Sequence, residues 1–181
     1  MPNWCENRLT IWHKDADVLD NLMAQVRADE NGDLFKYIKP MPDNIFRGAL
    51  GNEEREECER KGIPNWYDWS IDNWGTKWDA CHMDWSHGDD NNVTFTFDTA
   101  WSPPIPIYEA LMEQGFDVEA YYVEYGCAFA GEWHYSSEDE QYLDASFNID
   151  EEQVSPELDE VFDITRQLQE WAEEAKENDD E

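Results

Sequence analysis

The sequence predicts an α+β domain whose antiparallel sheet carries helices on one face. Two patterns support this prediction. Strand patterns occur at residues 7–13, 81–86, 93–99, 116–125 and 129–135. Apolar residues three and four apart indicate helices after the first and third strands. The order strand, helix, two strands, helix and strand, with one further strand, is that of a ferredoxin-like fold.

The opening strand and helix have firm local signals. Leu9 and Ile11 alternate with Arg8 and Thr10, as in a half-buried strand. Asp15 is a good N-cap for a helix that ends at Asn31-Gly32. The apolar stripe of that helix comprises Val18, Leu19, Leu22, Met23 and Val26.

A long insertion, at about residues 43–80, separates this unit from the next strands. Residues 52–61 are almost wholly charged and predict a solvated helix or a mobile excursion. Four tryptophans and a tyrosine follow within thirteen residues. At helical spacing, one aromatic face comprises Tyr67, Ile71, Trp74 and Trp78, and Trp66 and Trp69 share a neighbouring stripe. Such a helix is buried on most of its circumference, or keeps one face for a partner.

The remaining elements complete the domain. Turn residues 88–92 join the second and third strands as a hairpin. Pro103, Pro104 and Pro106 then set up a helix from Ile105 to Gln114 that Gly115 closes. The predicted division is a ferredoxin-like domain over residues 1–150 and an acidic C-terminal helix and tail over 151–181.

Charge is the dominant compositional feature. The 181 residues include 44 acidic and 12 basic side chains, a net charge of −32. Nonspecific binding to a phosphate backbone needs clustered cations, so the composition excludes it. The negative charge also disfavours binding to anionic membrane surfaces. The charge instead favours basic partners, of which nucleic-acid-binding proteins are the commonest class.

Cysteine usage and the chain start predict a cytoplasmic location. Cys5, Cys58, Cys81 and Cys127 are far apart in the sequence, and no leader or membrane span is expected. Four reduced thiols in a cytoplasm are therefore the expectation.

The C-terminal segment is the strongest functional candidate. Residues 132–181 contain nineteen acidic and two basic side chains. Pro156 starts a predicted helix whose inner face is Leu158, Val161, Phe162, Thr165, Leu168, Ala172 and Ala175. Its outer face comprises Glu160, Asp163, Gln167, Glu170, Glu174 and Glu177, and the residues that lead into it include Asp150, Glu151 and Glu152. Carboxylates at this spacing could imitate a nucleic-acid backbone toward a basic site, although a solvated face or salt adaptation gives the same pattern.

Several sequence blocks resemble the YubB ferredoxin-like (Api-type) family of phage- and plasmid-borne proteins. They are the opening MPNWCENRL, the PMP at residues 40–42, NWYDW and NWGTKW at 65–69 and 73–78, and FDTAWSPP at 97–104. The resemblance covers about residues 1–135 and leaves the acidic helix outside. It implies a ferredoxin-like fold and a mobile-element origin. It implies no activity, so no catalytic or binding residue carries over from it.

No catalytic, cofactor or metal site is predicted. Cys81, His82 and His87 lack the paired spacing of zinc ligands. Glu6 is expected in a salt bridge with Arg8 or Lys77, or as a cap in the core, rather than in acid–base chemistry. The alternative to a non-enzymatic acidic binding protein is a small-molecule binder or enzyme with a cleft beside Trp66, Trp69 and Trp101.

Overall fold

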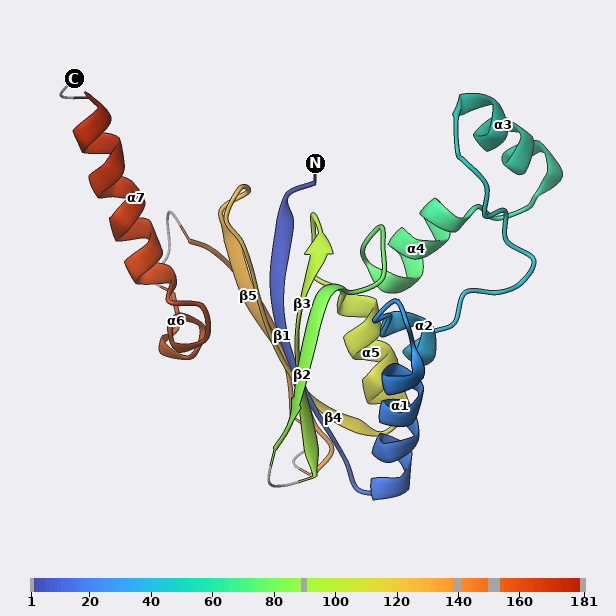
Figure 1. Cartoon of the computed structure of the whole chain (residues 1–181), viewed down its shortest axis with the longest axis horizontal. Helices are drawn as coiled ribbons and strands as arrows, with labels where there is room; N and C mark the ends of the chain where they lie inside the picture. The colour runs from blue at the N-terminus through green and yellow to red at the C-terminus, as the bar shows by residue number, and fades with distance from the viewer. Residues whose placement is uncertain (1, 89–90, 139–140, 150–153, 180–181) are drawn as a thin grey trace.

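The computed structural model describes residues 2–88, 91–138, 141–149 and 154–179, with the backbone alone from 175 to 179. Six strands and seven helices are formed within these residues (Figure 1). The strands are β1 (Trp4–His13), β2 (Cys81–His87), β3 (Asn92–Ala100), β4 (Phe116–Glu124), β5 (Phe129–Ser136) and β6 (Gln141–Asn148). The helices are α1 (Ala16–Ala28), α2 (Phe35–Ile38), α3 (Asn52–Lys61), α4 (Trp66–Trp74), α5 (Ile105–Glu113), α6 (Pro156–Phe162) and α7 (Ile164–Asp179).

The strands form one antiparallel sheet in the order β2-β3-β1-β4-β5-β6. Its first four strands have the ferredoxin-like order, in which β1 lies between β3 and β4. Leu9 of β1 pairs with Phe95 on one side and with Ala120 on the other. The predicted ferredoxin-like α+β fold is therefore confirmed.

The main core lies between one face of the sheet and helices α1, α2, α4 and α5 (Figure 1). Leu9, Phe95 and Leu111 are fully buried in it. The Asp15 side chain accepts a hydrogen bond from the amide of Asp17, so this predicted N-cap is confirmed. Because alternate residues of a strand point to opposite faces, Glu6 and Arg8 of β1 and Thr96 and Asp98 of β3 lie on the face away from this core.

Strand β6 was not predicted from the sequence. This edge strand pairs with β5 from Gln141↔Ser136 to Asn148↔Phe129. Most of its side chains are exposed, including Tyr142 and Leu143. Its main-chain bonds to β5, and not burial of a regular apolar face, hold it in the sheet, so apolar alternation gave little signal.

The insertion folds as α3 and α4, beside the helical layer (Figure 1). The predicted helix face of Tyr67, Ile71, Trp74 and Trp78 is wrong, because α4 ends before Trp78. The helix stops at Gly75, whose φ of +77° lies in the left-handed region. Trp78 consequently lies beyond the helix and is exposed, as is Ile71. Trp74 is buried, and its indole Nε1 donates to the Lys39 carbonyl at 2.9 Å.

Helices α6 and α7 lie on the opposite face of the sheet from the other five (Figure 1). The predicted helices of the ferredoxin-like unit thus lie on one face of the sheet, and the C-terminal helices, for which the sequence predicted no face, lie on the other. Leu158 and Ile164 are fully buried in a second, smaller core against Tyr121, Val123 and Ala130. This core attaches the C-terminal helices to strands β4 and β5.

Candidate functional site

The predicted acidic helix is two helices. Asp163 breaks it with φ +55°, and its amide donates to the Asp159 carbonyl at 2.8 Å. At about 100° per residue, a straight helix would point Leu158 and Ile164 about 120° apart. The break lets both reach the same small core, and aspartate tolerates the left-handed conformation better than most residues. The two helices are called the C-terminal arm below.

The break also divides the predicted outer face. Glu160 lies on α6, Asp163 is at the junction, and Glu170 and Glu174 lie on α7. All four are exposed. They do not form one row along a single helix axis, so the single acidic face predicted from Glu160 to Glu177 is wrong.

A basic side chain neutralises part of this surface. The Arg166 guanidinium pairs with Asp163 and, at 3.0 Å from Nη1 to Oε1, with Glu170. These exposed pairs at helical spacing are worth only a few tenths of a kcal/mol each. Glu160 is an exposed carboxylate on the other side of the junction.

Four predicted partner-binding residues have no described side chain. Asp150, Glu151 and Glu152 lie outside the described residues, and only the backbone of Glu177, within α7, is described. Their part in the predicted surface stays a prediction.

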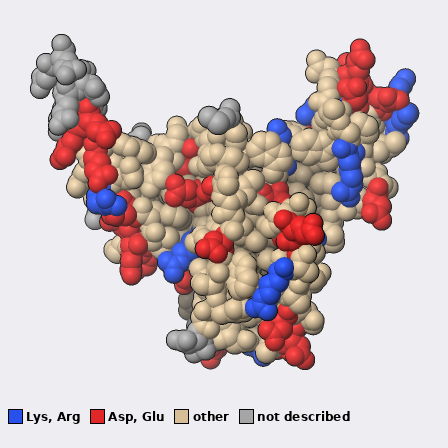
Figure 2. All heavy atoms as spheres, viewed as in Figure 1, with Lys and Arg blue, Asp and Glu red and all other residues tan. Residues whose placement is uncertain are grey.

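The arm is attached at its base. Besides Leu158 and Ile164, Tyr125 contacts it in two ways: its hydroxyl donates to the Phe162 carbonyl at 3.4 Å, and its ring meets Trp171 edge-on at 5.2 Å. The rest of α7 extends away from the sheet (Figure 1). Figure 2 shows acidic side chains along the C-terminal arm, with basic atoms near its base.

The three tryptophans of the predicted ligand cleft are not brought together. Trp66 starts α4, where its Nε1 donates to the Gly48 carbonyl at 3.1 Å. Trp69 packs edge-on against Trp74 and lines a shallow hollow between α3 and α4. Trp101 follows β3 and is half exposed. The hydroxyl of Ser102, the residue after Trp101, donates to the Gly75 carbonyl at the C-terminal end of α4. Trp66 lies at the other end of this helix, about 13 Å away along its axis, so the predicted cleft is wrong.

A hollow with no counterpart among the predicted sites lies on the outer face of the sheet, opposite the main core. We call it the sheet-face hollow; its volume is about 660 Å³. Strands β1, β2 and β3 form its floor, and Val161 and Phe162 of α6 form a wall. The polar residues that line it include Glu6, Arg8, His82, Thr96 and Asp98. Strand alternation could have placed Glu6 and Arg8 on one face, but only the pairing of β1 with β3 brings Asp98 beside them.

The expected salt bridge of Glu6 is not formed. Neither Arg8 nor Lys77 forms an ion pair with it among the described residues; the Lys77 ammonium lies 4.4 Å from the ring of Trp78 instead. Glu6 is the cross-strand neighbour of Asp98. Partial burial, and then the Asp98 charge, raise the pKa of Glu6.

Asp98 has a partner of its own. Its Oδ2 is 2.8 Å from Nδ1 of His82. His82 sits at a bulge of β2, where the register shifts between Cys81 and Asp84, and its φ is +51°. A bulky residue in this left-handed conformation is uncommon, and here the bulge turns the imidazole toward β3.

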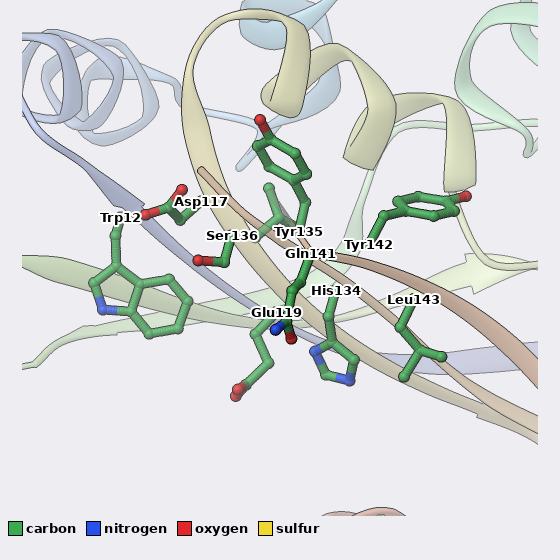
Figure 3. A pocket seen from close by; sticks show the side chains of 10 residues that line it. Trp12, Asp117, Glu119, His134, Tyr135, Ser136, Gln141, Tyr142 and Leu143 are labelled. Atoms are coloured by element: carbon green, nitrogen blue, oxygen red, sulfur yellow. The ribbon is translucent and has the colours of Figure 1, made fainter. Parts of the chain in front are cut away.

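A second hollow, of about 570 Å³, lies at the end of the sheet beside β5 and β6 (Figure 3). Trp12, Glu119 and His134 point to one side of the sheet, whereas Tyr135 and Tyr142 point to the other. Polar groups that diverge in this way do not converge on one ligand.

Two classes of site are not seen in the described part of the chain. No three His, Cys, Asp or Glu side chains within it are grouped to hold a metal ion. Across the same residues, no helix combines the length and the apolar character needed to cross a bilayer.

The fold and its outer-face arm define a ferredoxin-like α+β domain protein. A family model described as the ferredoxin-like domain in Api92-like protein matches residues 77–168, just over half of the sequence. The chain belongs to this family. The match extends through α6 into α7, which corrects the expectation that the acidic segment lies outside the shared region.

A solved structure supports the same architecture. The crystal structure of a protein api92 from Yersinia pseudotuberculosis aligns with a TM-score of 0.54 and 11% identity, over 86% of this chain and 100% of that chain. At this identity the likeness shows the fold alone. No curated protein matches the chain.

Proposed function

We propose that this chain is a non-enzymatic acidic binding protein that occupies a basic, nucleic-acid-binding host protein by imitating a nucleic-acid backbone. The phage- or plasmid-borne origin implied by the YubB resemblance belongs to the same proposal. A phage or plasmid would benefit from occupying a nucleic-acid-binding protein of host defence, and this choice of partner is made by analogy.

The charge of the C-terminal arm carries the proposal. Between residues 154 and 174 the arm has seven carboxylates and one basic side chain, Arg166. Its base is fixed on the sheet by Leu158 and Ile164, whereas α7 extends away from the sheet (Figure 1). A fixed acidic projection is suited to a positively charged groove, and the net charge of −32 speeds the encounter with such a partner.

The test compares two variants with equal changes in charge. The arm variant carries Glu157→Lys, Glu160→Lys and Glu173→Lys, which leaves the break and the Arg166 pairs intact. The control variant carries Glu53→Lys, Glu56→Lys and Glu59→Lys, all exposed positions on α3. Each protein is immobilised, and proteins are captured on it from a host lysate at about 0.1 M salt, where the Debye length is about 10 Å.

We expect the wild type and the control variant to retain a basic protein that double-stranded DNA displaces. The arm variant should lose it, and so should the wild type at about 1 M salt, where the Debye length is about 3 Å. Capture that resists both DNA and arm charge reversal would contradict mimicry. If nothing is captured and stability rises steeply with salt, the charge reflects salt adaptation instead.

A further inference from the structure

The sheet-face hollow contains a positive and a negative side chain that do not pair. Arg8 and Glu6 lie two residues apart on β1 and share a face, so their Cα atoms are about 7 Å apart. Within the described residues, neither the Arg8 guanidinium nor the Glu6 carboxylate has a hydrogen bond or an ion pair. Both side chains are exposed, so both charged groups are accessible to a ligand that enters the hollow.

The negative side of the hollow has room for a cation. Glu6 and Asp98 face each other across β1 and β3, and the Asp98 charge disfavours ionisation of Glu6. His82 occupies one oxygen of Asp98. A ligand ammonium group placed between the two carboxylates would relieve this repulsion and gain charge-assisted hydrogen bonds.

The positive side of the hollow limits the ligand further. Arg8 can bind a carboxylate through two parallel hydrogen bonds. A free anion, however, is repelled by the net charge of −32, and a simple cation would leave Arg8 unpaired. A zwitterionic ligand has no net charge, so the protein does not repel it, and its carboxylate can pair with Arg8.

The wall of the hollow is apolar. Val161 and Phe162 of α6 face the strands across it and are only partly buried. The volume of about 660 Å³ lies within the range of about 300–1,000 Å³ typical of small-molecule sites. An apolar side chain would bury surface against this wall.

We propose that the sheet-face hollow binds a free α-amino acid with an apolar side chain. Its ammonium group lies between Glu6 and Asp98, its carboxylate binds Arg8, and its side chain packs on Phe162. This site is independent of the proposed contact between the arm and a basic partner.

The first experiment measures binding of L-leucine, L-methionine and L-phenylalanine, each titrated separately into the full chain and followed by NMR. A matched set then tests the two charges: L-phenylalanine, phenethylamine without the carboxylate, and 3-phenylpropionate without the ammonium. We expect L-phenylalanine to bind about tenfold or more tightly than either analogue, since each lacks one charge-assisted contact.

Single substitutions assign the two charges to residues. Glu6→Gln and Arg8→Gln should each weaken binding of the amino acid about tenfold or more. Glu6→Gln should leave binding of 3-phenylpropionate unchanged, and Arg8→Gln should leave binding of phenethylamine unchanged. Glu113→Gln on α5 and Arg60→Gln on α3 are the matched controls, with the fold of every variant checked from its amide spectrum.

Three results would overturn the proposal. One is no binding of any of the three amino acids by about 10 mM. Another is phenethylamine binding as tightly as L-phenylalanine, which would make the hollow a receptor for cations alone. The third is equal binding by the wild type and the folded Glu6→Gln variant. None of these results bears on capture of a basic protein by the arm.

Discussion

The carboxylate of Asp79 accepts a hydrogen bond from the backbone amide of Phe35 at 2.7 Å, across 44 residues of sequence. The same carboxylate accepts from the amides of Leu34 and Lys36 at 2.8 and 3.0 Å. These amides begin α2, whose own N-cap, Leu34, offers no side-chain acceptor. Asp79 therefore caps α2 from the far end of the insertion and ties the two segments together.

Asp79→Ala should lower the free energy of unfolding by about 1–3 kcal/mol, because it leaves the amides of α2 without their acceptor. Urea unfolding measures this change. Asp72→Ala, at an exposed position on α4, is the control and should stay within about 0.5 kcal/mol of the wild type. Equal stability of the two variants would contradict the capping role.

Leu158→Ala should loosen the arm while leaving the main core intact. Leu158 is fully buried in the smaller core, so its truncation should cost about 2–5 kcal/mol. Hydrogen exchange should quicken at the amides of α6 and the first turns of α7 but not in β1. Leu143→Ala on exposed β6 is the control; uniform faster exchange throughout the sheet would show that the arm and the sheet unfold together.

Glu6→Gln should stabilise the protein at pH 7. The pKa of Glu6 is raised in the folded state, so the ionised wild-type side chain is disfavoured by folding. The loss of wild-type stability caused by Glu6 grows as the pH rises through the pKa of Glu6 in the folded state. It is absent below the pKa of about 4.3 that a glutamate has in the unfolded state. Urea unfolding at pH 7 and at about pH 3.5 should therefore show a gain at the higher pH only; lower stability of the variant at pH 7 would be the contrary result.

Asp29→Asn should destabilise the protein at neutral pH. Hydrogen bonds from Lys36 and Tyr37, and then from the Asp33 amide, hold the pKa of Asp29 well below its usual range. The stability that this carboxylate provides is present above the unfolded pKa of about 3.9 and is lost as the pH falls. The variant and the wild type should therefore converge in acid, as measured by thermal unfolding from pH 7 down to pH 2. Asp17→Asn, on α1, is the exposed control.

Local sequence determined the elements that depend on local forces. The alternation of Leu9 and Ile11 identified β1, and Asp15 identified the start of α1, because side-chain period and capping bonds act within a few residues. The total charge is also fixed by sequence alone. β6 was missed because main-chain pairing with β5, which depends on a distant segment, holds it in place.

Tertiary structure decided how the acidic helix bends and which polar residues meet. The second core needs both Leu158 and Ile164, and that requirement places a left-handed residue at Asp163 in the middle of a helical pattern. The register of β1 against β3 sets Glu6 beside Asp98 across 92 residues of sequence. Val161 and Phe162 of α6 line the same hollow from the side of the C-terminal arm. Pairings at this range depend on the whole sheet and on both cores, so no local pattern contains them.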